Sequence, residues 1–323
     1  MSITENAQTF DLRVKAVIWE TARIKTYELR ALDGGVLPPF SAGGHIQLNL
    51  RPDLVRSYSL MNAPSERHRY MISVQLEDSG TGGSKLVHAL LQPGSVVSVT
   101  GPRNNFPLVE GAERSVLIAG GIGITPILSM ARALSAAGKE WSLYYCARSR
   151  SEAALLEDVS ALAVSGRPIH THFNDEHDGG LLDLRALITA VPAGTHFYCC
   201  GPVPMLEAYT AATAGVPSEY VHLEYFTASE PAALEGGYTV TLSRSGKSFV
   251  IPPGKSILNV LLENGLNVPF ACAQGTCASC ETRVVAGTPD HRDVVLSQEE
   301  RDSNGTMMIC CSGSKGPQLI LDL

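Results

Sequence analysis

Four cysteines near the C-terminus have the residue type and the spacing needed for redox chemistry. Cys272, Cys277 and Cys280 follow the pattern C-x4-C-x2-C, and Cys310 comes after 29 further residues. This spacing is typical of a loop that holds a [2Fe–2S] cluster through four thiolates. A zinc site is the alternative, but structural zinc sites commonly use two separate C-x2-C pairs, and this stretch has one. The pattern therefore predicts electron transfer through a cluster.

The fourth ligand has two candidates, because Cys311 directly follows Cys310. Residues 307–312 are expected to form a buried strand that runs into a turn. The alternation of side chains along that strand does not choose between the two thiols.

Two stretches in the first third of the chain could bind a flavin. The segment 56–59 places an arginine, an aromatic ring and two hydroxyls in one strand, where they could pair with a phosphate and contact an isoalloxazine ring. Further on, Gly82 and Gly83 precede a predicted helix over residues 84–91 with Ser84 as its N-cap, and exposed amides there would bind an anion. The alternatives are an ordinary edge strand and a flexible hairpin.

A second glycine-rich stretch, residues 120–126, follows the apolar run 115–119 and reads Gly-Gly-Ile-Gly-Ile-Thr-Pro. This is not the Rossmann pattern G-x-G-x-x-G, but its glycines would also let a pyrophosphate approach backbone amides. Thr125 could cap the helix that follows, and Pro126 suits a first helical turn.

The strand predicted over residues 196–200 ends in Cys200-Gly201-Pro202. A turn there would lie at the carboxyl end of an α/β sheet, beside a nicotinamide. Cys200 could face the ring, or it could be only a small buried hydrophobe.

The pattern of elements divides the chain of 323 residues into three domains. Residues 9–103 contain short alternating segments that predict five or six antiparallel strands and a small barrel. Residues 105–228 alternate between strands and helices, which predicts a parallel sheet. A small-residue linker, 229–237, then leads to a hairpin, a helix over 256–264 and the cysteine loop. We expect domains at 1–104, 105–228 and 238–323.

Composition narrows the class of protein. The net charge of −7 argues against a nucleic-acid footprint, which needs a basic face. The start of the chain does not resemble a secretion signal, and no long apolar run is free of glycine and proline. We therefore expect a cytoplasmic protein whose cysteines are not paired in disulfides.

Together, the Arg-x-Tyr-Ser strand, the Gly-Gly-Ile-Gly-Ile-Thr-Pro unit, the Cys-Gly-Pro turn and the C-terminal cysteine loop resemble the phthalate dioxygenase reductase family. These are the class IA reductases of Rieske oxygenases, and the resemblance covers essentially the whole chain. It implies an antiparallel FMN barrel, an α/β nucleotide domain like that of ferredoxin-NADP reductases, and an α+β β-grasp ferredoxin domain. Cys310 takes the position of the fourth ligand in this family, and Cys311 is a departure from its pattern.

The resemblance also implies roles for individual residues. It implies that the flavin is bound by Arg56, Ser57, Tyr58, Ser59, Gly82, Gly83 and Ser84. It implies that the nicotinamide nucleotide is bound by Gly120, Gly121, Ile122, Gly123, Thr125, Pro126, Cys200, Gly201 and Pro202. Phe226 matches an aromatic residue close to the flavin, and Ser59, Cys200 and Phe226 are the candidate catalytic residues.

The implied activity is transfer of a hydride from NADH to FMN, followed by passage of single electrons through the cluster. The implied partner is a Rieske-type oxygenase, met transiently by a monomeric reductase and acting on phthalate or a similar aromatic acid. A vanillate- or carnitine-type system is the alternative, and a non-Rieske reductase is a further one.

Two choices of cofactor stay open on the residues alone. Arg148 and Arg150 follow the second strand of the nucleotide domain and could bind the 2′-phosphate of NADPH, whereas the resemblance favours NADH. Convergence of Arg56 and Ser84 on one phosphate favours FMN over FAD, and no aromatic residue stands out as a platform for a flavin adenine.

Overall fold

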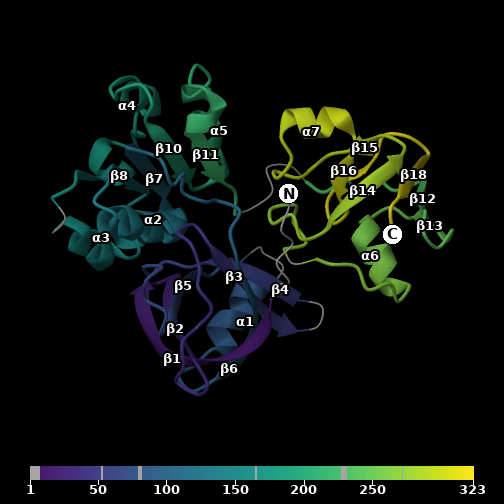
Figure 1. Cartoon of the computed structure of the whole chain (residues 1–323), viewed down its shortest axis with the longest axis horizontal. Coiled ribbons are helices and arrows are strands. Elements are labelled where there is room, and N and C mark those ends of the chain that lie inside the picture. The colour runs from purple at the N-terminus through teal and green to yellow at the C-terminus, as the bar shows by residue number, and fades with distance from the viewer. Residues whose placement is uncertain (1–7, 52–53, 79–81, 164–165, 227–230, 271) are drawn as a thin grey trace. The chain divides into compact units, whose positions relative to one another are not determined.

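The computed structural model describes residues 8–51, 54–78, 82–163, 166–226, 231–270 and 272–323. The chain divides into two compact units, Met1–Glu224 and Tyr225–Leu323. In Figure 1 the first unit runs from purple to green, and the second from green to yellow. The first unit holds the two sheets that were predicted for the flavin and nucleotide domains, and the second holds the cysteine loop.

The N-terminal part of the first unit is a six-stranded antiparallel sheet in the order β4-β3-β6-β1-β2-β5. Strand β1 shows why it forms: Leu12 and Val14 are buried, and the residues between and beside them are exposed, so one face lies on the core. The edge strands β4 and β5 approach each other, which curls the sheet into the predicted barrel. The elements are β1 (Thr9–Thr21), β2 (Ile24–Ala31), β3 (His45–Arg51), β4 (Leu54–Ser59), β5 (Tyr70–Gln75), α1 (Gly83–Leu90) and β6 (Val96–Arg103).

The rest of the first unit is a five-stranded parallel sheet in the order β11-β10-β7-β8-β9. Its central strand β7 is buried from Ser115 to Gly120, as expected of a parallel strand covered on both faces. The strands are β7 (Arg114–Gly120), β8 (Glu140–Ala147), β9 (Ile169–Phe173), β10 (His196–Cys200) and β11 (Val221–Glu224). The helices are α2 (Ile124–Ala136), α3 (Leu156–Leu162), α4 (Leu184–Thr189) and α5 (Val203–Ala212), with 3-10 turns η1 (Gly121–Gly123), η2 (Arg150–Glu152), η4 (Asn174–His177) and η5 (Ser218–Tyr220).

The barrel and the parallel sheet are joined by buried polar contacts. Ser129 of α2 donates a hydrogen bond of 3.0 Å from Oγ to the carbonyl of Asn62, which follows β4. Arg132 of the same helix donates to the carbonyl of Met61 and pairs with Asp158. These contacts fix helix α2, which begins at the glycine-rich loop, to the segment that follows the predicted flavin strand.

The second unit is a mixed five-stranded sheet in the order β13-β12-β18-β14-β16, with a separate ladder of β15 and β17. Helix α6 begins with a capping box between Ser256 and Asn259. The elements are β12 (Tyr238–Leu242), β13 (Ser248–Ile251), α6 (Ile257–Glu263), β14 (Glu281–Ala286), β15 (Pro289–Asp290), α7 (Gln298–Ser303), β16 (Thr306–Met308), β17 (Gly313–Ser314) and β18 (Gln318–Leu321). The expected combination of barrel, parallel sheet and α+β ferredoxin domain is confirmed.

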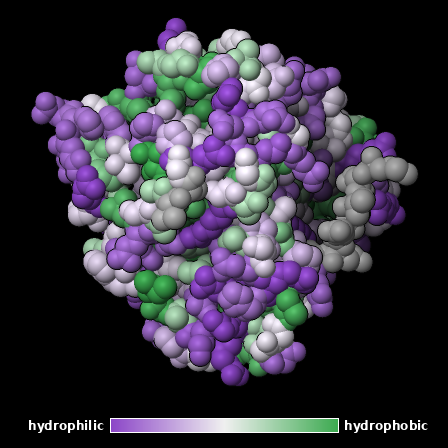
Figure 2. Space-filling model, turned by 60° about the vertical axis from the view of Figure 1, so that its left-hand side comes forward, coloured by the Kyte–Doolittle hydropathy of each residue, from purple (hydrophilic) through white to green (hydrophobic). Residues whose placement is uncertain are grey.

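None of the helices in the described parts of the chain is long and apolar enough to cross a bilayer. On the face shown in Figure 2, apolar side chains form small groups separated by polar ones.

Candidate functional site

The four predicted cluster cysteines come together in the second unit. Three lie in the loop between α6 and β14, and Cys310 follows β16. All four are at least 93% buried. The thiol of Cys272 contacts those of Cys277 and Cys310, and the thiol of Cys280 contacts that of Cys310.

Backbone amides of the cysteine loop point at the sulfur atoms. The amide of Cys272 donates to Cys277 Sγ, and those of Gln274 and Thr276 donate to Cys272 Sγ, each at 3.3 Å. The neighbouring thiols of Cys277 and Cys310, together with the Gln274 amide, lower the pKa of Cys272. Amides that donate to a sulfur atom stabilise its thiolate, which is the form of cysteine that binds iron.

The four thiols lie close enough together to bind one group. Cys272 contacts both Cys277 and Cys310, and Cys310 also contacts Cys280, so the contacts join all four thiols. In the described part of the chain, no three His, Cys, Asp or Glu side chains are placed to hold a single metal ion. A [2Fe–2S] cluster needs two ligands on each iron, so these residues fit the group that their spacing predicts.

Cys311 lies beside the loop in a different way. A Cβ atom on Gly275 would come within 2.5 Å of its Sγ, so the loop closes directly over this sulfur. The Cys311 thiol also approaches the Met308 carbonyl at 3.8 Å. Cys310, by contrast, faces the thiols of Cys272 and Cys280.

The two predicted flavin stretches meet in the barrel. Arg56 and Tyr58 lie on β4, and a Cβ atom on Gly83 would come within 2.7 Å of Arg56 Cγ and 2.8 Å of its Nε. The guanidinium stem thus lies against the first residue of α1. Ser57 Oγ is buried and has no hydrogen-bond partner among the described residues. An arginine beside a helix N-terminus fits a phosphorylated ligand, and the unpartnered Ser57 hydroxyl leaves a second polar group on the same strand.

The start of α1 differs from the expectation in one detail. The helix begins at Gly83 and its N-cap is Gly82, which has a φ of 90°, so Ser84 is not the cap. Glycine adopts this left-handed conformation without the strain that a Cβ would cause. The Ser84 hydroxyl instead accepts a hydrogen bond of 3.0 Å from the Glu77 amide. It therefore closes the turn in front of the helix.

The nucleotide loop packs directly on the Cys-Gly-Pro turn. A Cβ atom on Gly123 would lie 2.2 Å from the Cys200 carbonyl oxygen, and one on Gly120 would lie 2.7 Å from Pro202 Cδ. These contacts follow from the sheet, because β7 and β10 are parallel neighbours. Two motifs 80 residues apart therefore form one surface at the carboxyl ends of the central strands, where α/β sheets bind ligands.

Thr125 and Pro126 both lie in the first turn of α2, whose N-cap is Gly123. The prediction that Thr125 caps this helix is wrong. Its hydroxyl donates to the carbonyl of Ile122 at 3.0 Å and so holds the 3-10 turn that carries the glycines.

Cys200 is fully buried, and desolvation raises the pKa of its thiol. It therefore stays a neutral thiol in the nucleotide domain and is not a nucleophile. Ser59, also buried, ends β4 opposite His45. Phe226, which is partly buried, belongs to the second unit.

One residue at this edge of the sheet escaped the sequence analysis. Glu224 ends β11 directly beside Cys200 on β10. Its Oε2 is buried and has no hydrogen-bond partner among the residues that the structure describes, and desolvation raises the pKa of the carboxyl to about 8. At pH 7 this side chain is therefore protonated and could donate a hydrogen bond. Its position depends on the pairing of β10 with β11, which the sequence did not predict.

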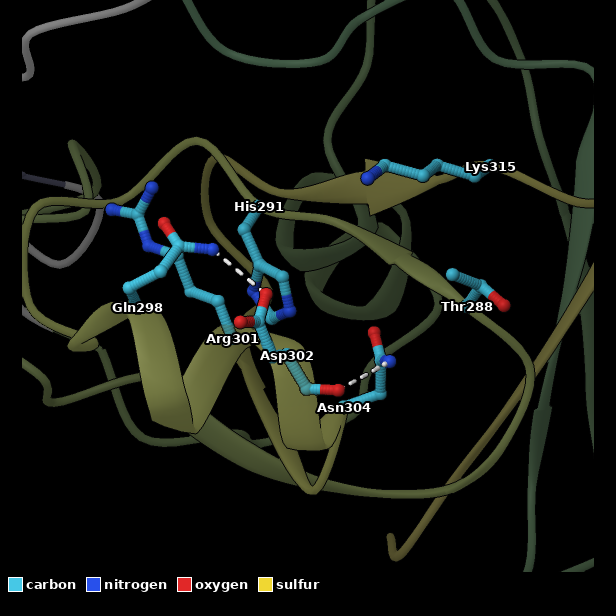
Figure 3. A pocket seen from close by; sticks show the side chains of 7 residues that line it. All are labelled: Thr288, His291, Gln298, Arg301, Asp302, Asn304 and Lys315. Carbon is cyan, nitrogen blue, oxygen red and sulfur yellow. Dashed lines mark hydrogen bonds between the residues drawn. The ribbon is translucent and has the colours of Figure 1, made fainter.

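The second unit also has a pocket of about 300 Å³ that contains none of the predicted site residues (Figure 3). The His291 side chain in its wall is 7% exposed, and neither ring nitrogen has a hydrogen-bond partner in the described chain. Burial lowers the pKa of this imidazole. The pocket is lined by Thr288, His291, Gln298, Arg301, Asp302, Asn304 and Lys315. We assign no ligand to it.

Comparisons with known proteins agree with this organisation. Residues 117–211 match the oxidoreductase NAD-binding domain, and residues 240–314 match the 2Fe-2S iron-sulfur cluster binding domain. The chain is 50% identical to the phenoxybenzoate dioxygenase subunit beta of Ectopseudomonas oleovorans, with all of both chains covered. It is 46% identical to the tetrachlorobenzoquinone reductase of Sphingobium chlorophenolicum over 99% of this chain and 100% of the relative.

Among solved structures, phthalate dioxygenase reductase, described as a modular structure for electron transfer from pyridine nucleotides to [2Fe–2S], superposes with a TM-score of 0.78. The two chains are 37% identical, and 98% of each is covered. The chain is therefore an oxidoreductase that uses NADH, a flavin and a [2Fe–2S] cluster, and it belongs to the phthalate dioxygenase reductase family.

Proposed function

We propose that this chain is the reductase component of a two-component Rieske oxygenase that acts on phthalate or a similar aromatic acid. The observation that carries the proposal is the set of four buried thiols in contact with one another, on a C-terminal unit that follows flavin and nucleotide sites in the same chain. A chain built in this order can take electrons from NADH and pass them to a separate protein. Two relatives named as the reductase subunits of phthalate 4,5-dioxygenase and carnitine monooxygenase support the same role, as does one named vanillate O-demethylase oxidoreductase.

The flavin in this proposal is FMN, and it supplies a centre that accepts two electrons together and releases them singly. Arg56 pairs with its phosphate, and the amides at Gly82 and Gly83 donate to the same phosphate at the N-terminus of α1. The buried hydroxyl of Ser57 provides a further donor, and Tyr58 and Ser59 complete the strand against the ring. Chromatography of the released flavin separates FMN from FAD.

The nicotinamide nucleotide lies along the joined glycine loop and Cys-Gly-Pro turn. Gly120, Gly121 and Gly123 let its pyrophosphate approach the N-terminus of α2, while Ile122, Thr125 and Pro126 hold the shape of the loop. Cys200, as a neutral buried thiol, and the Gly201-Pro202 turn keep water from the reacting end. Phe226 is the aromatic residue proposed to lie near the flavin. Hydride transfer between two rings requires that the rings are correctly positioned and that water is excluded from between them. It requires no acid–base pair.

Cys272, Cys277, Cys280 and Cys310 hold the cluster. The FMN, NAD and ferredoxin domains are residues 1–104, 105–228 and 238–323, respectively. The linker 229–237 joins the last two, and part of it lies outside the described residues. All eight cysteines are free, which is usual for the reducing cytoplasm where we place the protein. We take it to act as a monomer that meets its oxygenase in short encounters.

Reconstitution tests the proposal. NADH, this chain and a Rieske oxygenase should together oxygenate the substrate of that oxygenase. Phthalate, vanillate and carnitine oxygenases are tried in parallel, and the aromatic acids are expected to react. A chain that ends before Tyr238 should lose oxygenation and keep NADH-dependent flavin reduction. If the shortened chain still supported oxygenation, the role given to the ferredoxin domain would be wrong. Because one relative is named a tetrachlorobenzoquinone reductase, this quinone is a second acceptor to test with both chains.

A further inference from the structure

The residues after β8 lie where a dinucleotide fold distinguishes its two nucleotides. In such folds the end of the second strand meets the adenosine ribose, where an acid binds the 2′-hydroxyl of NAD and an arginine accommodates the 2′-phosphate of NADP. Here β8 is that second strand, and Arg148 and Arg150 follow it. These two residues alone favour NADPH, contrary to the use of NADH.

The structure gives Arg150 a partner from the next strand. Strand β9 lies parallel to β8, with Phe173 opposite Ala147, and Glu176 follows in η4. Arg150 Nε lies 3.0 Å from Glu176 Oε1, and its Nη2 lies 3.2 Å from Oε2. The guanidinium also lies over the Phe173 ring at 4.5 Å. The Nε and Nη2 donors of the Arg150 guanidinium therefore both bind one carboxylate, that of Glu176.

Backbone contacts hold the two turns together. The amide of Asp175 donates to the carbonyl of Arg148 at 3.1 Å, so the turn after β9 is tied to the turn after β8. The side chains of Arg150 and Glu176 are 60% and 46% exposed, so a nucleotide can reach the pair. Asp175 adds a second carboxylate to the same turn. A dianionic phosphate that approached Arg150 would meet the Glu176 carboxylate.

We propose that Glu176 sets the preference of this chain for a nucleotide whose ribose has a free 2′-hydroxyl. It does so by occupying the guanidinium of Arg150 and by placing a carboxylate where the 2′-phosphate of NADPH would lie. NAD sites usually carry an acid at the end of the second strand. Here the turn after the third strand, β9, supplies it. The proposal rests on NADH use and does not depend on which oxygenase the reductase serves.

The variant Glu176→Gln tests this with ferricyanide as electron acceptor, so no oxygenase is needed. The ratio of kcat/KM for NADPH to kcat/KM for NADH should rise roughly twofold to fivefold, the size expected for an exposed ion pair that no longer competes. The change should lie in KM for NADPH and not in kcat, because the 2′-phosphate is remote from the reacting ring. The double variant E176Q/R150A should have a lower ratio than E176Q, because it also lacks the guanidinium that E176Q releases.

Glu140→Gln is the matched control. Glu140 pairs with Arg167 at 2.7 Å at the amino end of β8. The same charge is therefore removed at the end of the strand that lies away from Arg150. This variant should leave the ratio unchanged. Inhibition by 2′,5′-ADP should strengthen in E176Q, and inhibition by 5′-AMP should not. An unchanged ratio in E176Q would refute the proposal. An equal rise in E176Q and E176Q/R150A would show that lost negative charge alone acts, and would overturn the role of Arg150.

Discussion

Replacing Glu224 by glutamine should change how the stability of the protein depends on pH. The native carboxyl has a pKa of about 8, raised by desolvation from 4.5. Between these values the native state keeps a proton that the unfolded state has lost. Wild-type stability therefore falls as pH rises through this range, because the native state binds more protons than the unfolded state. Glutamine titrates in neither state, so the variant lacks this loss.

The magnitude follows from the two pKa values. Their separation corresponds to roughly 5 kcal/mol at pH values above both, at about 1.36 kcal/mol per pH unit. Between pH 6.0 and pH 8.5 the wild type should lose about 2.5 kcal/mol relative to Glu224→Gln. For a unit of this size that equals a change of roughly 5–10 °C in the difference between their Tm values. Any constant effect of glutamine on packing cancels, because the comparison is made between two pH values.

Flavin fluorescence during thermal unfolding of the holoprotein measures this difference, since the first unit carries both Glu224 and the proposed flavin strand. Glu207→Gln, on the exposed face of α5, is the control and should show the same pH dependence as the wild type. The reasoning fails if the Tm difference between E224Q and the wild type is equal at the two pH values, or larger at pH 6.0.

Two further predictions concern the cluster and the nucleotide loop. Cys277→Ser should remove the visible absorption of the cluster and about two iron atoms per chain, while NADH still reduces the flavin, because the thiols and the nucleotide loop lie in different units. Gly123→Ala should lower kcat/KM for NADH by roughly 10- to 100-fold, because its Cβ would lie 2.2 Å from the Cys200 carbonyl and must displace the loop. Gly111→Ala, where a Cβ meets nothing within 4 Å, should leave kcat/KM unchanged; equal losses in both variants would contradict the packing argument.

The local motifs could be predicted because the residues that carry their chemistry lie close together in the sequence. Three of the four cluster cysteines lie within nine residues, and one loop brings them together whatever the rest of the chain does. The helix caps were less predictable. Ser84 and Thr125 are both residue types that cap helices, but a glycine stands at each N-cap. Gly82 has a positive φ, and at Gly123 the backbone lies against the Cys200 carbonyl.

Contacts between strands account for what the sequence did not reveal. Glu224 lies beside Cys200 only because β11 pairs with β10 in a particular register, and Glu176 reaches Arg150 only because β9 pairs with β8. A shift of one residue in either register would turn these side chains to the other face of the sheet. Neither register can be predicted from the composition of the strands. Several strands of this sheet are apolar and of similar length, so their sequences do not specify which strand pairs with which.

At each of the three proposed sites, a glycine allows a short motif to pack against a segment that is distant in sequence. At Gly83, Gly123 and Gly275 an added Cβ would lie 2.2–2.7 Å from Arg56, Cys200 and Cys311, respectively. Each contact joins a motif to a segment distant in sequence, so these glycines are needed for close approach. Gly82 and Gly121 differ, because a Cβ there would meet nothing within 4 Å and the positive φ alone favours glycine. The sequence shows several glycines near candidate sites, but only the packing separates those that join two motifs from those that shape a turn.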